Sequence, residues 1–282
     1  MSLDLSTVGH QTQPFSFEYD WKTVVLYALG VGATRSELDF LYEGRGPRVL
    51  PTFAVVPSYP AVAALFEKTR ADMTRLVHGG QMIRLHRAIP PAARLETVGH
   101  VKGIYDMKKL AQLVIATTTT LAGEPCFDTE WSLLVRDAGG FNGPRPPKAD
   151  IPRAPDRDPD FTVVSPTSPE QALLYRLSGD LNPLHADPEF ARAVGFADGP
   201  ILHGLCTFGI VGRALISGLG GDERSIKAFG AQFRRPVWPS EPIKTTGYVL
   251  EGGRVALEAF AGEKPDPVIT GAWAEVSPIR GA

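Results

Sequence analysis

The stretch that decides the fold spans residues 200–219 and reads PILHGLCTFGIVGRALISGL. A proline at its start and the pair Gly220 and Gly221 after its end predict a helix over these residues. Apolar side chains occupy most of the circumference of this helix, and a helix that is apolar nearly all round must be buried. The surrounding sequence must therefore supply a cover for most of its surface.

Three strands predicted after this helix can supply the cover. Patterns rich in β-branched residues occupy 243–250, 254–261 and 268–276. Gly252 and Gly253 lie between the first two strands, where they favour a tight hairpin turn. The C-terminal half is therefore predicted to be an α+β domain in which an antiparallel sheet wraps round one central helix.

The N-terminal half repeats this pattern at a constant shift. Tyr27 aligns with Tyr175 at a shift of 148 residues, within the matching segments 26–29 and 174–177. The same shift aligns a second, distant pair of segments, in which Pro91, Leu95, Thr97, Gly99 and Val101 fall on Pro239, Ile243, Thr245, Gly247 and Val249. Two matches at one shift indicate an internal duplication. In the C-terminal copy, residues 169–177 predict a short helix with Leu173, Leu174 and Leu177 on one face.

A change of composition separates the two copies. Residues 137–160 contain six prolines and three glycines, which interrupt any helix or strand pattern. We therefore expect an N-terminal domain over residues 1–136, a linker over 137–160 and a C-terminal domain over 161–282.

The composition argues against several classes of protein. A net charge of −2 does not supply the basic surface of a nucleic-acid binder. No apolar run approaches the ~20 residues of a membrane span, and the N-terminus lacks the basic-then-apolar order of a signal peptide. Cys126 and Cys206 lie far apart, so a disulfide framework is unsupported. We expect a protein of the reducing cytoplasm with no nucleic-acid or membrane partner.

The chemistry concentrates in residues 175–188, which read YRLSGDLNPLHADP. Pro183 and the proline at 188 disfavour a continuous helix and predict an ordered turn. Across such a turn, Asp180 and His185 can hold one water between them, with one accepting its proton and the other orienting it. Asn182 is expected to fix the water or a carbonyl group, and the charges of Asp180 and Asp187 are expected to raise the pKa of His185.

An oxyanion site is predicted where the buried helix opens. Free amides and the positive end of the helix dipole gather there, and Gly204 lets an oxygen approach the backbone. Water addition to a double bond conjugated with a thioester places negative charge on the carbonyl oxygen, which these amides would stabilise. His203 is expected to support Gly204 or to contact the substrate.

Residues 175–188 and 200–204 closely resemble the hydratase 2 motif of the MaoC-like (R)-specific 2-enoyl-CoA hydratases, which have a hot-dog fold. Residues 26–33 and the linked N-terminal copy resemble the two-domain, eukaryotic-type members, so the resemblance covers nearly the whole chain. It implies a double hot-dog fold, with two antiparallel sheets each wrapped round a central helix. It also implies a homodimer.

The activity that the resemblance implies is reversible hydration of trans-2-enoyl-CoA to (3R)-3-hydroxyacyl-CoA in fatty-acid metabolism, without a metal or an organic cofactor. Asp180 and His185 would be the catalytic pair, Asn182 would support them, and the Gly204 amide would bind the thioester oxygen.

The N-terminal copy is expected to be catalytically silent. The shift of 148 residues places Gly32, Thr34 and Glu37 opposite the catalytic set, and none of them repeats its chemistry. Pro57 and Pro60 predict an interrupted central helix in this copy. Such a gap would make room for medium or long acyl chains.

Other interpretations of the same residues stay open. Arg234 and Arg235 precede a proline on a predicted strand, where one could meet a CoA phosphate or both could be solvated. Asp180, His185, Asp187 and His203 are residue types that bind metals, but neither their spacing nor the family motif favours a metal site. The alternative activities are a dehydratase acting on carrier-protein thioesters, a non-catalytic acyl-thioester binder and a hot-dog thioesterase.

Overall fold

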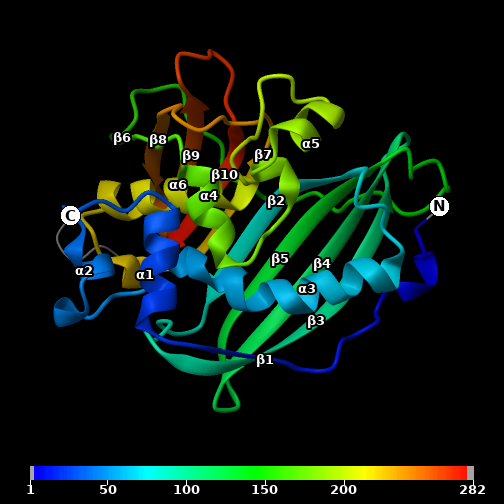
Figure 1. Ribbon diagram of the computed structural model, residues 1–282, viewed down its shortest axis with the longest axis horizontal. Coiled ribbons are helices and arrows are strands. Elements are labelled where there is room, and N and C mark those ends of the chain that lie inside the picture. Colours follow the sequence, from blue (N-terminus) through cyan, green and yellow to red (C-terminus); the bar gives the residue numbers. More distant parts are fainter. Residues whose placement is uncertain (1–2, 278–282) are drawn as a thin grey trace.

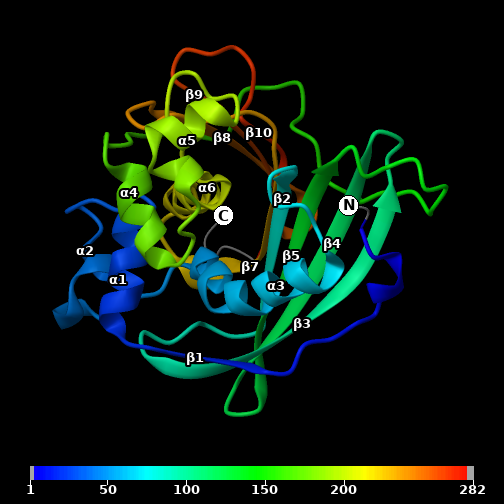
Figure 2. The same ribbon diagram turned by 45° about the vertical axis from the view of Figure 1, so that its right-hand side comes forward.

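The central helix of the C-terminal half is buried among strands, as its sequence predicts. The computed structural model describes residues 3–277, and in it helix α6 spans Gly204–Gly218. Phe208, Ile210 and Val211 on this helix have no exposed surface, and burying each contributes about 1.5–3 kcal/mol. Figure 2 shows α6 nearly end-on, with strands curving round it.

Five antiparallel strands form the cover, in the spatial order β7-β10-β9-β8-β6. Two of them have the predicted bounds, and β10 begins one residue later than predicted. The turn between β8 and β9 contains Gly252 and Gly253, whose φ angles of 72° and 69° favour glycine. The strands are β6 (Phe161–Ser165), β7 (Ile226–Phe233), β8 (Ile243–Leu250), β9 (Arg254–Ala261) and β10 (Ile269–Val276).

The N-terminal half has the same arrangement with longer strands. Its spatial order, β1-β3-β4-β5-β2, mirrors that of the C-terminal half. Helix α3 (Val55–Thr69) lies across this sheet (Figure 1) in the position that α6 has in the other half. The strands are β1 (Phe15–Tyr19), β2 (Leu76–Leu85), β3 (Ala93–Asp106), β4 (Leu110–Leu121) and β5 (Glu124–Arg136).

The sheets of the two halves meet edge to edge. Strand β2 pairs antiparallel with β7, from Gly80 opposite Gln232 to Arg84 opposite Ala228, so that the ten strands form one hydrogen-bonded sheet. Arg84 also reaches across β7 to Glu275 on β10, with nitrogen–oxygen distances of 2.8 and 3.1 Å. The double hot-dog fold is therefore confirmed, with its two sheets joined into one.

The predicted interruption of the N-terminal central helix is wrong, because α3 is continuous. Pro57 lies in its first turn, where a backbone N–H is not needed. Pro60 lies inside the helix, where a proline costs about 3 kcal/mol. Val62 and Leu65 are 0% and 1% exposed, and burial of about 1.5–3 kcal/mol each offsets that cost.

Two shorter helices pack the halves together. Helix α1 (Trp21–Gly30) lies beside α4 (Gln171–Tyr175) in both views (Figures 1 and 2). The Gln171 side chain donates hydrogen bonds to the carbonyl oxygens of Leu29 and Gly30, at 3.1 and 2.7 Å. This packing buries Tyr175, which is 2% exposed.

One face of α4 remains uncovered. Leu173 is 49% exposed and Leu177 is 58% exposed. The helix ends at Tyr175 and continues as the 3-10 turn η4 (Arg176–Ser178). Because α1 contacts the opposite side of this short element, the leucine face stays on the surface.

The remaining helical segments lie in loops. They are α2 (Leu38–Leu41), α5 (Pro188–Ala193), η1 (Leu5–Thr7), η2 (Glu43–Arg45), η3 (Pro51–Ala54), η5 (Pro183–His185), η6 (Glu223–Ser225) and η7 (Glu251–Gly253). Between β5 and β6 the chain forms no helix or strand. Within residues 3–277, no helix has both the length and the apolar character needed to cross a membrane.

We predict that Gly209→Ala destabilises the protein, because α6 meets the end of α1 at this glycine. A Cβ at this position would lie 2.3 Å from Val31 Cγ1 and 3.0 Å from the Tyr27 hydroxyl. Overpacking should exceed the helix-propensity gain of alanine and lower the free energy of unfolding by about 1–2 kcal/mol. Urea denaturation measures the change, with exposed Ser217→Ala on the same helix as the control. Equal stability of the two variants would contradict this packing constraint.

Candidate active site

The turn after η4 is shaped by its own side chains. Asp180 Oδ1 accepts a hydrogen bond from the backbone N–H of Asn182 at 3.2 Å. Asn182 Oδ1 accepts one from the N–H of Leu184 at 3.0 Å and so caps η5, which ends at His185. Asn182 is exposed. Its recorded bonds shape the turn, and its direct contact with water stays a prediction.

His185 is held by a hydrogen bond to the segment that leads into α6. The ring is 8% exposed, and Nδ1 lies 2.8 Å from the carbonyl oxygen of Ile201. A carbonyl oxygen can only accept, so Nδ1 carries the proton. The neutral ring therefore has its lone pair on Nε2, where it can act as a base.

The pKa of His185 is lowered, which corrects the direction expected from the sequence. Burial disfavours the charged ring and outweighs both the Ile201 hydrogen bond and the attraction of Asp180, which raise the pKa. Asp187 is not among the groups that shift this pKa. Its carboxylate accepts hydrogen bonds from the N–H groups of Glu189 and Phe190 and caps α5. His185 is thus a neutral base at ordinary pH.

The polar atoms of the site are close enough to share one small ligand. Asp180, His185 and His203 each offer one nitrogen or oxygen atom, and these three atoms lie within 4.8 Å of one another. A single water can bridge two atoms at this separation with two ordinary hydrogen bonds. The same atoms are of types that bind zinc. However, the rings of His185 and His203 stack at 3.7 Å with an interplanar angle of 26°, so their in-plane lone pairs do not converge on one ion.

Helix α6 begins at Gly204, four residues later than the sequence predicts. The reason is local pairing of the preceding residues, since the Ile201 carbonyl is taken by His185 and the Leu202 N–H donates to Val237 at 2.8 Å. In the described part of the chain, no backbone acceptor pairs with the N–H groups of Gly204 or Leu205. These free amides at a helix N-terminus suit a developing oxyanion.

His203 lies between these parts and is 1% exposed. Its Nε2 lies 3.1 Å from the backbone carbonyl oxygen of Asp180 and therefore carries the proton. Its Nδ1 is buried and has no hydrogen-bond partner within the described residues, an arrangement that costs about 1–3 kcal/mol. Burial lowers the pKa of His203 well below its ordinary value, and nearby His185 lowers it further.

The N-terminal half contributes aromatic side chains that sequence reasoning missed. Burial, with a smaller contribution from the charge of Asp180, raises the pKa of Tyr59 to about 12, so the two side chains lie near each other. The rings form a row in the order Tyr59, Trp131, His78 and Phe233. The centroid distances between successive rings are 6.0, 5.2 and 5.0 Å. A Cβ at Gly204 would lie 3.5 Å from Phe233. The row therefore runs from the neighbourhood of Asp180 to the free amides.

The only sequence signal for this row was its aromatic residue types, which also occur in any core. His78 belongs to this row. The structure places it half-buried on β2, where burial lowers its pKa to about 4. It is therefore neutral beside Trp131.

The two predicted phosphate-binding arginines follow Phe233 and are both exposed. Arg235 forms an ion pair with Asp266 at 2.6 Å. Arg234 donates to Thr270 Oγ1 at 2.6 Å and to the side chain of Gln232, and no described carboxylate lies within ion-pair distance of it. Arg234 thus keeps an uncompensated charge next to the site.

The counterpart of the site in the N-terminal half is a cavity with different chemistry. Gly32, Thr34 and Glu37 line it together with Arg213 of α6, and its volume is about 300 Å³. Glu37 pairs with Arg213, with Oε1 at 3.1 Å from Nε, and Glu37 Oε2 also accepts from the N–H of Thr34 at 3.0 Å. Its carboxylate is fully engaged, in contrast to the open base in the C-terminal half.

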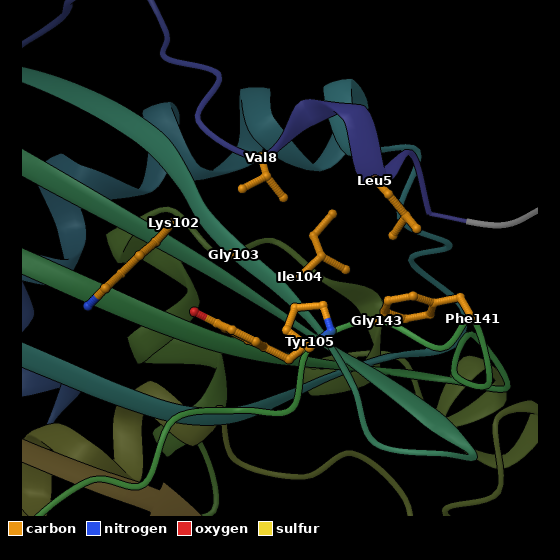
Figure 3. A pocket seen from close by; sticks show the side chains of 9 residues that line it. Leu5, Val8, Lys102, Gly103, Ile104, Tyr105, Phe141 and Gly143 are labelled. Atoms are coloured by element: carbon orange, nitrogen blue, oxygen red, sulfur yellow. The ribbon is translucent and has the colours of Figure 1, made fainter.

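A second cavity, of about 320 Å³, lies at the outer end of β3. Figure 3 shows that its side chains are mostly apolar, with Leu5 of η1 and Phe141 at one end and the polar ends of Lys102 and Tyr105 toward the other. None of the predicted site residues lines it.

Comparisons with known proteins agree with the geometry. The family model described as the MFE-2 hydratase 2 N-terminal domain matches residues 17–137, and the MaoC like domain matches 150–272. The chain is 40% identical to 3-hydroxyacyl-thioester dehydratase Y of Mycobacterium tuberculosis over 91% of each chain. It is 35% identical to enoyl-CoA hydratase ChsH3 of the same organism, over 95% of this chain and 97% of the relative.

Among solved structures, a MaoC-like dehydratase from Phytophthora capsici superposes with a TM-score of 0.87 at 28% identity, covering 97% of this chain and 98% of that one. Both family models, the identities over nearly the full length and the fold lead to the same assignment. The chain belongs to the MaoC-like hydratase 2 family, in its two-domain form.

Proposed function

We propose that this protein is an enoyl-CoA hydratase 2, a hydro-lyase that reversibly adds water to trans-2-enoyl-CoA to give (3R)-3-hydroxyacyl-CoA. The observation that carries the proposal is the neutral base His185 beside Asp180, next to the free amides of Gly204 and Leu205. The thioester substrates named for the two mycobacterial relatives support the same class of substrate.

The chemistry follows from these positions. Nε2 of His185 takes a proton from the water that Asp180 orients, and the water oxygen bonds to C3 of the enoyl group. The electrons of the double bond move toward C2 and the thioester oxygen, whose negative charge the Gly204 amide stabilises. The proton then returns to C2, which restores neutral His185 and completes the addition of one water.

Thioesters with medium or long acyl chains remain our proposed substrates. The support for them now comes from the structure and not from the sequence pattern. A gap in α3 can no longer be the reason, because that helix is continuous. The support is the row of Tyr59, Trp131, His78 and Phe233 beside the reacting groups, since aromatic surface can cover an extended apolar chain.

We expect wild-type protein to hydrate a graded series of enoyl-CoAs, with activity maintained beyond the shortest chain. Asp180→Asn and His185→Ala should each lower kcat by about 10²–10⁴-fold, because each removes a group that handles the water. Absorbance of the conjugated thioester measures the rate, chiral chromatography assigns the product, and His86→Gln on the surface is the control.

Four outcomes would contradict parts of the proposal. Unchanged turnover in His185→Ala would overturn the mechanism. A steep fall of activity after the shortest chain would overturn the chain-length proposal. Release of free CoA thiol from a saturated acyl-CoA would identify a thioesterase, and binding without any turnover would identify a non-catalytic acyl-thioester binder.

The alternative activity is dehydration of 3-hydroxyacyl thioesters on a carrier protein, in the reverse direction. The 40% identity to a relative named a 3-hydroxyacyl-thioester dehydratase favours keeping it. One site catalyses both directions, so only the carrier distinguishes the two candidates. Higher kcat/KM for a carrier-protein thioester than for the matching CoA thioester would favour the alternative.

Arg234 is our proposed contact for a CoA phosphate, because its charge has no carboxylate partner among the described residues. Arg234→Gln should raise KM for an enoyl-CoA about 5–20-fold with little change in kcat, since a charged hydrogen bond contributes about 1–2 kcal/mol. KM for the corresponding pantetheine thioester, which lacks the nucleotide phosphates, should not change. The distant Arg94→Gln variant is the control, and equal effects on both substrates would exclude this contact.

We also propose that two chains associate as a homodimer through the leucine face of α4 and η4 together with Leu181 in the turn that follows. Leu173, Leu177 and Leu181 are 49%, 58% and 60% exposed, and such apolar groups favour an interface. Light scattering should give twice the mass of the chain for the wild type and one chain mass for Leu177→Asp. A monomeric wild type would contradict the proposal.

The cytoplasmic location stays a proposal as well. Both cysteines are free and buried, which suits a reducing compartment. Fractionation of the source cells tests it, and recovery of the protein with another compartment would overturn it.

A further inference from the structure

His203 contacts both His185 and Asp180 and precedes Gly204 in the chain, but it is not one of the reacting groups. Its ring stacks on the ring of His185 at 3.7 Å. Its Nε2–H donates to the backbone carbonyl of Asp180 at 3.1 Å. Its own backbone is bonded directly to Gly204, whose amide faces the substrate oxygen in the proposed reaction.

These contacts join three segments of the chain. Asp180 lies in the turn after η4, His185 ends η5, and His203 is the residue before α6. The backbone carbonyl of His203 accepts from the N–H groups of Cys206 and Thr207, at 3.0 and 3.2 Å. The ring is therefore anchored on the first turn of the rigid, buried helix and projects from there onto the catalytic turn.

We propose that His203 is a positioning residue that holds the Asp180 and His185 side of the site in register with the Gly204 amide. The inference rests on the proposed hydration, in which the base and the oxyanion donor must act on atoms of one conjugated system. The hydrogen bond from His203 fixes the position of the Asp180 backbone relative to α6, and the stacked His203 ring fixes the orientation of the His185 ring. Reactions of this kind lose rate steeply when reacting groups move by an ångström.

The identity of the residue separates this role from simple packing. The site around the ring is apolar and aromatic, with Tyr175 at a centroid distance of 4.9 Å, and the buried Nδ1 has no partner within the described residues. Phenylalanine would fill the same space without that unpaired nitrogen. What phenylalanine lacks is the N–H that reaches Asp180.

Two substitutions at His203 test the hydrogen bond and the ring stacking separately. His203→Phe keeps the flat ring and removes the donor, whereas His203→Gln keeps a donor at nearly the same reach and removes the stacking ring. We expect each to lower kcat about 10–100-fold while KM for an enoyl-CoA changes less than about 3-fold, because positioning acts on the reacting geometry. His203→Phe should keep the unfolding temperature of the wild type. His86→Gln, which alters an exposed histidine paired with Asp128, should leave kcat unchanged.

The outcomes distinguish the inference from the function on which it rests. Active wild type with full kcat in both variants would overturn the inference alone. Loss of kcat together with a matching rise of KM and a lowered unfolding temperature in both variants would also overturn it, because it would reveal a packing role. Wild-type protein that hydrates no enoyl-CoA would overturn the proposed function itself, and the inference with it.

Discussion

The site depends on one hydrogen bond, from Nδ1 of His185 to the carbonyl oxygen of Ile201. This bond fixes the tautomer of the ring and so places the lone pair on Nε2. It also occupies the carbonyl that the Leu205 N–H would otherwise use in a helix that began earlier. The base and the free amide of Leu205 are therefore two results of a single contact.

The two copies of the fold contribute different parts to the site. Helix α6 serves both loops, since its first turn faces the catalytic turn while Arg213 further along reaches Glu37 in the other half. The bidentate pairing of that carboxylate satisfies its oxygens, so the N-terminal loop has become a contact between halves. The N-terminal half in return contributes three of the four rings of the aromatic row, Tyr59, Trp131 and His78. Each half is thus incomplete alone, although both have the same sequence of elements.

Much of this architecture could be predicted from the sequence. The strands at 243–250 and 254–261 and the burial of α6 follow from residue patterns that act locally. Proximity of Asp180 and His185 followed from their short spacing across a proline-containing turn. These features need no information about the other half of the chain.

The failures share a cause, which is dependence on distant partners. Helix α6 starts late because Ile201 and Leu202 bond to His185 and Val237. The pKa of His185 falls because of burial, which neighbouring charges in the sequence do not reveal. Pro60 is tolerated in α3 because the whole helix is packed on a sheet.

The pairing of β2 with β7 limits how the enzyme can move. Separating the halves would break that ladder together with the pair of Arg84 and Glu275, so the molecule lacks the hinge on which many two-domain enzymes close. Substrate must enter a site whose walls are already assembled. Any gating therefore falls to small displacements of surface loops, and the arrangement of Asp180, His185 and the free amides is present before a substrate arrives.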